Sequence, residues 1–97
     1  MDSILKIEWS AAALADLDRF ANFLQTDFPN LASVVAREIL AKADEIAANP
    51  RLGRVLDEQK SFRQVVLRVL NAAYVFQYRY DGQRLVVLRV FHSREQR

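Results

Sequence analysis

The stretch YVFQYRYDGQRLVVLRVF, residues 74–91, does most to decide the fold of this chain. Two runs rich in aromatic and β-branched residues flank Asp81-Gly82, and both turn residues tolerate the positive φ angles of a tight hairpin turn. The pattern predicts a β-hairpin with strands over residues 72–80 and 84–92. Strict alternation in the second strand places Val86, Leu88, Val90 and His92 on one face and Leu85, Val87, Arg89 and Phe91 on the other. Both faces are largely apolar, which favours an interior strand.

Upstream of the hairpin, residues 62–69 (FRQVVLRV) read as a further strand and residues 3–9 (SILKIEW) as a short first strand. RLGR, residues 51–54, reads as a turn. Ser10 is a typical helix N-cap for residues 11–25, and a second helix is expected over 31–48, ended by Asn49-Pro50. The proline of TDFPN separates the two helices.

The predicted helices are amphipathic, and each carries an apolar stripe at helical spacing. The stripes are Leu14, Leu17, Phe20, Ala21 and Leu24 in the first helix, and Val35, Ile39, Ala43 and Ile46 in the second. Asp16, Asp18 and Arg19 lie off the first stripe. The expected fold is therefore α+β: a two-layer β-α-α-β-β-β domain in which a helical hairpin packs on an antiparallel sheet. The sheet face opposite the helices is left for a partner, for a basic patch, or for both.

Composition narrows the class of protein. A chain of 97 residues fits one domain, residues 1–97. It contains no cysteine and one histidine, so no disulfide, metal site or cofactor is expected. No apolar run reaches the roughly 20 residues of a membrane-spanning helix, and the first ten residues are unlike a secretory signal. A cytoplasmic protein without membrane contact is the expectation.

The net charge of +2 conceals an asymmetry between the halves of the chain. Residues 1–50 hold four basic and eight acidic side chains, whereas residues 51–97 hold ten basic and four acidic ones. Nine of the ten late cations are arginine, whose planar donor fork matches phosphate and carboxylate groups. This excess indicates either a solvated sheet surface or a patch facing nucleic acid or an acidic protein segment.

The segment HSREQR, residues 92–97, holds the chain's only histidine beside arginines. Metal-free RNA cleavage needs a base, an acid and cations that stabilise the charged phosphorane. Histidine ordinarily titrates near neutral pH and suits proton transfer. If the protein is a nuclease, His92 is the proton-transfer candidate, and the phosphate-clamp candidates are Arg63, Arg68, Arg89 and Arg94. No second proton-transfer group stands out, because Tyr74, Tyr78 and Tyr80 read first as one packed face of a strand.

Taken together, IEWS with ALADLDRFANFL, IAANPRLGR, FRQVVLR, YVFQYRY and VLRVFHSREQR resemble the RelE/ParE superfamily of bacterial toxins, also known as plasmid stabilisation proteins. The resemblance spans most of the chain. It implies a toxin without cofactor, neutralised by a cognate antitoxin whose disordered segment folds along a groove of the toxin. A dimer or a toxin–antitoxin heterotetramer is the assembly that the resemblance suggests.

The superfamily divides by target, and the resemblance favours the ParE-like branch, which poisons DNA gyrase and cleaves no RNA. The long helical hairpin, NPRLGR, YVFQYRY and VFHSR look ParE-like, and nothing after Arg94 resembles the second catalytic group of many RelE-like nucleases. On this reading Arg89, His92, Arg94 and Arg97 are the target-binding candidates. One alternative is a RelE-like ribosome-dependent mRNA endonuclease, with ribosome and mRNA as partners. The other is a non-toxic module that only binds the antitoxin.

Overall fold

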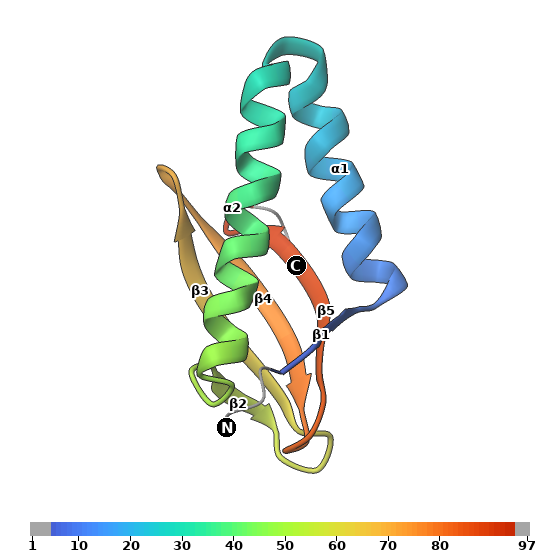
Figure 1. The fold of residues 1–97 in the computed structure, drawn as a ribbon, viewed down its shortest axis with the longest axis vertical. Helices are drawn as coiled ribbons and strands as arrows, with labels where there is room; N and C mark the ends of the chain where they lie inside the picture. Colours follow the sequence, from blue (N-terminus) through green and yellow to red (C-terminus); the bar gives the residue numbers. More distant parts are fainter. Residues whose placement is uncertain (1–4, 95–97) are drawn as a thin grey trace.

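The computed structural model describes residues 5–94, with all of their side chains except that of Thr26. The elements in chain order are β1 (Ile7–Trp9), α1 (Ala11–Asp27), α2 (Pro29–Ala48), β2 (Arg54–Asp57), β3 (Phe62–Val69), β4 (Ala72–Tyr80) and β5 (Leu85–His92). Two helices cover one face of a single five-stranded sheet, and the end of the hairpin where α1 joins α2 extends past the sheet (Figure 1). The α+β two-layer prediction is confirmed.

The strand order is β1-β5-β4-β3-β2, so β5 is an interior strand, as its two apolar faces predicted. Two details of the prediction need correction. The prediction missed β2, an edge strand that pairs antiparallel with β3 and begins at the last residue of RLGR, read as a turn. In addition, β1 pairs with β5 in parallel, whereas the other strand pairs are antiparallel. The first strand was expected over residues 3–9; within the described residues it begins at Ile7.

The helix ends follow local chemistry. Ser10 caps α1 as predicted, because its hydroxyl oxygen accepts a hydrogen bond from the N–H of Ala13 at 3.0 Å. Phe28 alone separates the helices and has a non-helical backbone, as expected for a residue before proline. The second helix begins at Pro29, two residues earlier than predicted, because proline is well tolerated at the first position of a helix.

The core lies between the helical hairpin and the sheet, and it confirms the stripe of α2 and the packed face of the three tyrosines. In α1, Leu17, Phe20 and Leu24 pack against the core as predicted, but Leu14 does not. Leu14 is half exposed, whereas Ala13 is fully buried and Asp16 is only 1% exposed. The acidic residue assigned to the surface is thus the one buried charged side chain among the described residues.

The two faces of β5 also differ from the predicted alternation. Tyr78 pairs with Val87 and Gln77 pairs with Arg89, which leaves Leu88 without an opposite residue. Such a bulge shifts the alternation by one residue. As a result Leu85 and Val87 share the helix-covered face with Val90, which strict alternation had put on the other side. The bulge therefore decides the direction in which the end of β5 presents His92.

Candidate functional site: a groove between the helical hairpin and the sheet

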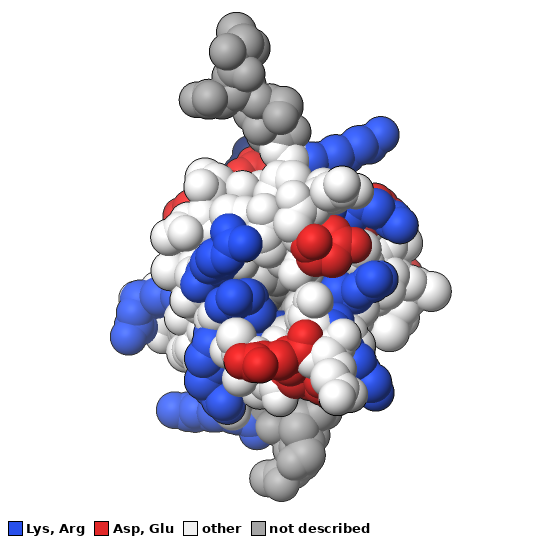
Figure 2. Space-filling model, turned by 90° about the horizontal axis from the view of Figure 1, so that it is seen from below, with Lys and Arg blue, Asp and Glu red and all other residues white. Residues whose placement is uncertain are grey.

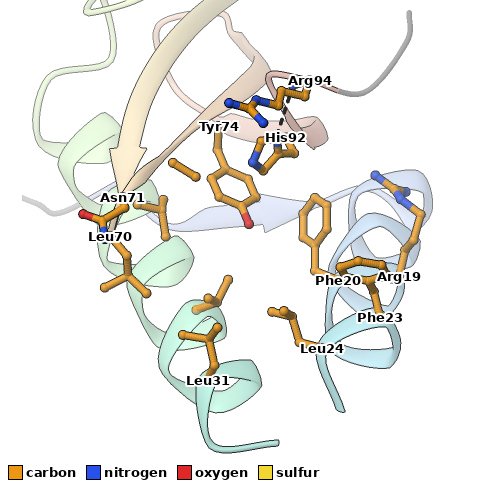
Figure 3. A pocket seen from close by; sticks show the side chains of 13 residues that line it. Arg19, Phe20, Phe23, Leu24, Leu31, Leu70, Asn71, Tyr74, His92 and Arg94 are labelled. Carbon is orange, nitrogen blue, oxygen red and sulfur yellow. Dashed lines mark hydrogen bonds between the residues drawn. The ribbon is translucent and has the colours of Figure 1, made fainter. Parts of the chain in front are cut away.

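A groove of about 720 Å³ lies where the hairpin extends past the sheet. Its walls come from α1, α2, the β3–β4 turn and the end of β5 (Figure 3). The lining residues are Arg19, Phe20, Phe23, Leu24, Leu31, Val35, Val69, Leu70, Asn71, Ala72, Tyr74, His92 and Arg94. The lining is mostly apolar, with its cations at Arg19 and Arg94.

Several apolar side chains of the groove are unusually open to solvent. Phe23 is 78% exposed, and Leu31 and Leu70 are about 40% exposed. Contiguous apolar surface of this kind is typical of a site that another molecule covers. Sequence analysis missed these residues, although Phe23 follows Phe20 by three positions and so extends the apolar side of α1.

The floor of the groove is a row of three rings. The ring of Phe20 meets that of Tyr74 edge-on at 5.3 Å between centroids, and Tyr74 meets His92 in the same way at 5.2 Å. Figure 3 shows the hydroxyl of Tyr74 pointing into the groove. His92 and Tyr74 are directly opposite in the β4–β5 ladder, so the sheet itself holds this pair.

His92 and Arg94 lie together at the rim. The backbone N–H of Arg94 donates to Nδ1 of His92 at 3.0 Å, so a neutral ring carries its proton on Nε2. On the other wall Arg19 sits over the ring of Phe20, with its guanidinium carbon 4.9 Å from the centroid. The apolar groove thus has a cationic rim.

The bulge beside the groove is held by a buried carboxylate. Asp16 accepts from the N–H of Val90 at 2.8 Å, from Nε and Nη2 of Arg89 at 2.8 and 3.0 Å, and from Arg19 at 2.6 Å. Burial raises the pKa of Asp16, but the hydrogen bonds from Arg89, Arg19 and Val90 outweigh it and leave this pKa below its ordinary value. Arg89, a predicted target-binding residue, is therefore bound within the chain to α1.

Ser10 fixes the same bulge from the other side. Its N–H donates to the carbonyl of Val87 and its hydroxyl to the carbonyl of Leu88, both at 2.9 Å. The Trp-Ser pair of the resemblance thus joins the start of α1 to β5, which positions His92 in the groove.

At the opposite end of the sheet, a second set of hydrogen bonds closes the molecule. The fully buried Tyr78 donates its hydroxyl hydrogen to the carbonyl of Pro50 at 2.7 Å and accepts from the N–H of Gly53 at 2.8 Å. A side chain at Gly53 would put its Cβ 2.8 Å from the carbonyl oxygen of Gln64 and 2.9 Å from the Tyr78 hydroxyl. The NPRLGR segment therefore serves to dock the chain after α2 onto β4.

The structure separates the residues proposed for RNA cleavage. Arg63 donates to the carbonyls of Gly53 at 2.7 Å and Arg51 at 3.3 Å, at the closed end. In the sheet Arg63 pairs with Tyr78, whereas His92 pairs with Tyr74. These two tyrosines are four residues, or about 13 Å, apart along β4. Arg68 pairs with Ala73 and lies on the sheet face opposite the groove. Only His92 and Arg94 come together, and Arg97 lies outside the described residues.

Two further observations concern the part of the chain that the structure describes. No cluster of three or more histidine, aspartate or glutamate side chains suited to a metal ion occurs in residues 5–94. Neither helix in that range is long and apolar enough to cross a membrane.

A sequence model of the family described as "ParE toxin of type II toxin-antitoxin system, parDE" matches residues 7–97. The chain belongs to this family, within the RelE/ParE superfamily, and is thus a toxin of the type II toxin–antitoxin class.

Among relatives, the protein Y4kP of Sinorhizobium fredii is 31% identical over 91 residues, which cover 94% of this chain and 91% of Y4kP. Toxin RelE3 of Caulobacter vibrioides is 29% identical over 91 residues, covering 94% of this chain and 97% of that protein. A solved structure titled as the chromosomal ParDE system from P. aeruginosa has the same fold, with a TM-score of 0.70 at 22% identity, over 92% of this chain and 96% of that one.

Proposed function

We propose that this toxin inhibits DNA gyrase and is neutralised by a cognate antitoxin that binds in the groove. The observation that carries the first half is the dispersal of the cations. Arg63 is hydrogen-bonded at the closed end, Arg68 faces away from the groove, and Arg89 is bound to Asp16. A metal-free nuclease needs its cations around one phosphate. Their dispersal leaves His92 and Arg94 as parts of a binding surface.

The antitoxin half of the proposal rests on the groove. Its open apolar side chains suit the apolar face of an amphipathic helix, and Arg19 and Arg94 at the rim suit acidic residues on the flanks of that helix. An antitoxin segment that folds as it binds would cover Leu31 and Phe23, and Phe23 is the most exposed large apolar side chain among the described residues.

A supercoiling assay with purified gyrase and relaxed plasmid tests the target. The expected result is that supercoiling falls as the toxin concentration rises, and that preincubation with the antitoxin restores it. Unaffected supercoiling at a large toxin excess, by toxin that still binds the antitoxin, contradicts gyrase as the target.

A ribosome-dependent mRNA endonuclease is the second candidate, because His92 and Arg94 do lie side by side at an open rim. Sequencing of mRNA ends after induction decides between the two. New ends on ribosome-bound messages with wild-type toxin, absent with His92→Ala, would establish the nuclease. Unchanged mRNA ends together with arrested growth favour gyrase.

The third reading, a non-toxic antitoxin-binding module, makes the opposite growth prediction. Induction without the antitoxin should then leave growth normal while folded protein accumulates. Arrested growth removes this reading.

A further inference from the structure

A polar hollow of about 400 Å³ lies at the closed end of the molecule, away from the groove. Its lining comes from the loop after α2, from β2, from the β2–β3 turn and the start of β3, and from the end of β4 with the β4–β5 turn. The lining residues are Arg51, Val55, Glu58, Ser61, Phe62, Arg63, Tyr80, Asp81 and Gly82. We propose that this hollow and the cations around it bind the phosphodiester backbone of a nucleic acid.

The two arginines of the hollow are held in place while most of their donors are unused. Arg51 lies over the ring of Tyr80, with its guanidinium carbon 5.5 Å from the centroid. Arg63 is fixed through Nη1 alone, to two backbone carbonyls. A guanidinium has five N–H donors, so each side chain keeps donors for a bound oxyanion. Because both are already positioned, little side-chain freedom is lost on binding.

These arginines differ from several others of the basic second half. Arg84 is bound bidentately to Glu8 at 2.6 and 2.8 Å, and Arg89 is bound to Asp16. Among residues 5–94, neither Arg51 nor Arg63 has a carboxylate within 4.0 Å. The basic excess read from the sequence is therefore not spread evenly, and part of its unpaired charge is concentrated at this end.

One further cation lies beside the hollow: Lys60, in the β2–β3 turn, has its ammonium 5.8 Å from the ring centroid of Phe62, which lines the hollow. Arg54 is exposed on β2 but pairs with Gln64, which puts it on the sheet face opposite Arg63. Figure 2 looks at this end of the molecule, where Lys and Arg side chains lie on both sides of central Asp and Glu side chains. Several separate cations match the repeated phosphates of a nucleic-acid strand better than they match one small anion.

Two carboxylates line the hollow, those of Asp81 and Glu58, and they are the main argument against anion binding there. They differ in how far neighbouring groups offset their charge. One oxygen of Asp81 accepts from the N–H groups of Gln83 and Arg84 at 3.0 and 2.9 Å, and these hydrogen bonds, with that of Arg84 the larger effect, lower its pKa. Its other oxygen is 3.8 Å from Arg79. Glu58 is exposed, and its backbone carbonyl accepts from the N–H of Ser61 at 3.2 Å, but its carboxylate makes no hydrogen bond or ion pair among the described residues. Glu58 is therefore the group that opposes anion binding most, and it provides a sensitive test.

The chemistry favours a nucleic acid over an acidic peptide. A peptide that folds on binding needs apolar pockets for its anchors, whereas the only wholly apolar lining side chains here are Val55 and Phe62, and Lys60 lies over the Phe62 ring. Guanidinium forks and a serine hydroxyl suit phosphate oxygens, and they read charge without base sequence.

The test is fluorescence anisotropy of a 20-base-pair DNA duplex and of a single-stranded RNA, titrated with the full-length chain over a series of salt concentrations. We expect binding that is independent of base sequence, with log K falling linearly against log salt by about 0.9 per duplex phosphate contacted and about 0.7 for a single strand. The tighter of the two probes identifies the nucleic acid. No binding to either probe at low salt overturns the proposal.

The variants separate a local site from overall charge. Arg51→Gln should reduce the salt slope by about one and weaken binding about tenfold, as should removal of Lys60 in Lys60→Gln. The matched control is Arg37→Gln, which removes the same charge from the exposed surface of α2 and should change neither quantity. Equal losses in Arg37→Gln and Arg51→Gln overturn the proposal, because the effect would then be one of net charge.

Glu58→Gln should tighten binding severalfold, since it removes the opposing charge without removing a contact. Weaker binding by this variant contradicts the site. A second outcome also contradicts the proposal: polyglutamate binds as tightly as the duplex, and its binding depends on Arg51 in the same way. That result would assign the hollow to an acidic peptide. Neither gyrase nor antitoxin enters these measurements, so their failure is distinct from failure of the proposed function.

Discussion

The two ends of this molecule differ in whether their polar and apolar groups find partners within the chain. At the closed end, backbone groups of the chain after α2 are satisfied by Tyr78 and Arg63, and a side chain on Gly53 would not fit. At the groove, the hairpin extends past the sheet and leaves apolar side chains such as Phe23 in solvent. The closed end therefore satisfies its polar groups within the chain, whereas the groove leaves apolar surface that the proposed antitoxin segment would cover.

The largest effect is expected beside the groove, at Asp16, which holds the bulge of β5. Replacing Asp16 by Ala leaves the N–H of Val90 unsatisfied and removes a carboxylate that both Arg89 and Arg19 bind. We expect a loss of about 3 kcal/mol in the free energy of unfolding, discounted because both arginines are partly exposed and regain water. Urea denaturation measures it, with Asp18→Ala on the same helix as control. A loss below about 0.5 kcal/mol contradicts the role given to this carboxylate.

A smaller loss of stability is expected at the closed end. Tyr78→Phe removes one hydroxyl and leaves a carbonyl of Pro50 and the N–H of the buried Gly53 without their partner. The expected cost is about 2 kcal/mol, read as a fall in the melting temperature, with antitoxin affinity unchanged. Tyr80→Phe, which has no such pair of hydrogen bonds among the described residues, is the control. Equal melting temperatures for wild type and Tyr78→Phe would show that the loop is held by other contacts.

At the groove we expect a substitution to weaken antitoxin binding while leaving the stability of the fold unchanged. Phe23→Ser alters a side chain that is 78% exposed, so the free energy of unfolding should change by less than about 0.5 kcal/mol. Antitoxin affinity should fall at least tenfold, about 1.4 kcal/mol, because an apolar anchor is lost. Calorimetric titration against the antitoxin measures this. Leu14→Ser, on α1 but outside the groove, is the matched control, and equal affinities for the two variants contradict antitoxin binding in the groove.

The pH dependence of stability gives the smallest signal. The pKa of Asp16 is lower in the folded chain than in the unfolded one, so folding favours the ionised form. Its contribution is complete above the ordinary carboxyl pKa of about 4 and is lost as the pH falls through the lower folded value. Below pH 4 the urea midpoint of the wild type should fall more steeply than that of Asp16→Asn. Parallel acid limbs for the two proteins would refute this assignment.

Sequence patterns predicted the two-layer fold, the cap at Ser10, the buried stripe of α2 and the interior position of β5, because each depends on local spacing and residue type. The patterns failed where a long-range contact overrides spacing. Helical spacing places Asp16 off the apolar stripe, and its burial becomes favourable through the distant partners Arg89 and Val90 together with Arg19. The alternation of apolar and polar residues likewise could not predict the bulge at Leu88, because this bulge is held by hydrogen bonds from Ser10.

For the candidate site, the sequence identified His92 and Arg94 from their place in the tail, and the structure brings them together at the groove. It did not identify the apolar walls, since Phe23, Leu31 and Leu70 look like core residues in any helix or strand pattern. The grouping of Arg63 and Arg68 with His92 was a hypothesis about spatial proximity, and strand register separates them. Register follows from pairing across the whole sheet, which residue spacing alone does not encode.

The most direct measurement of the proposed function follows both targets in the same cells. The wild-type toxin is induced without its antitoxin, and plasmid topology and mRNA ends are recorded from one culture before growth stops. Inhibition of gyrase predicts a loss of negative supercoiling in the plasmid while ribosome-bound mRNA stays intact. Normal supercoiling together with new mRNA ends that are absent with His92→Ala would contradict inhibition of gyrase.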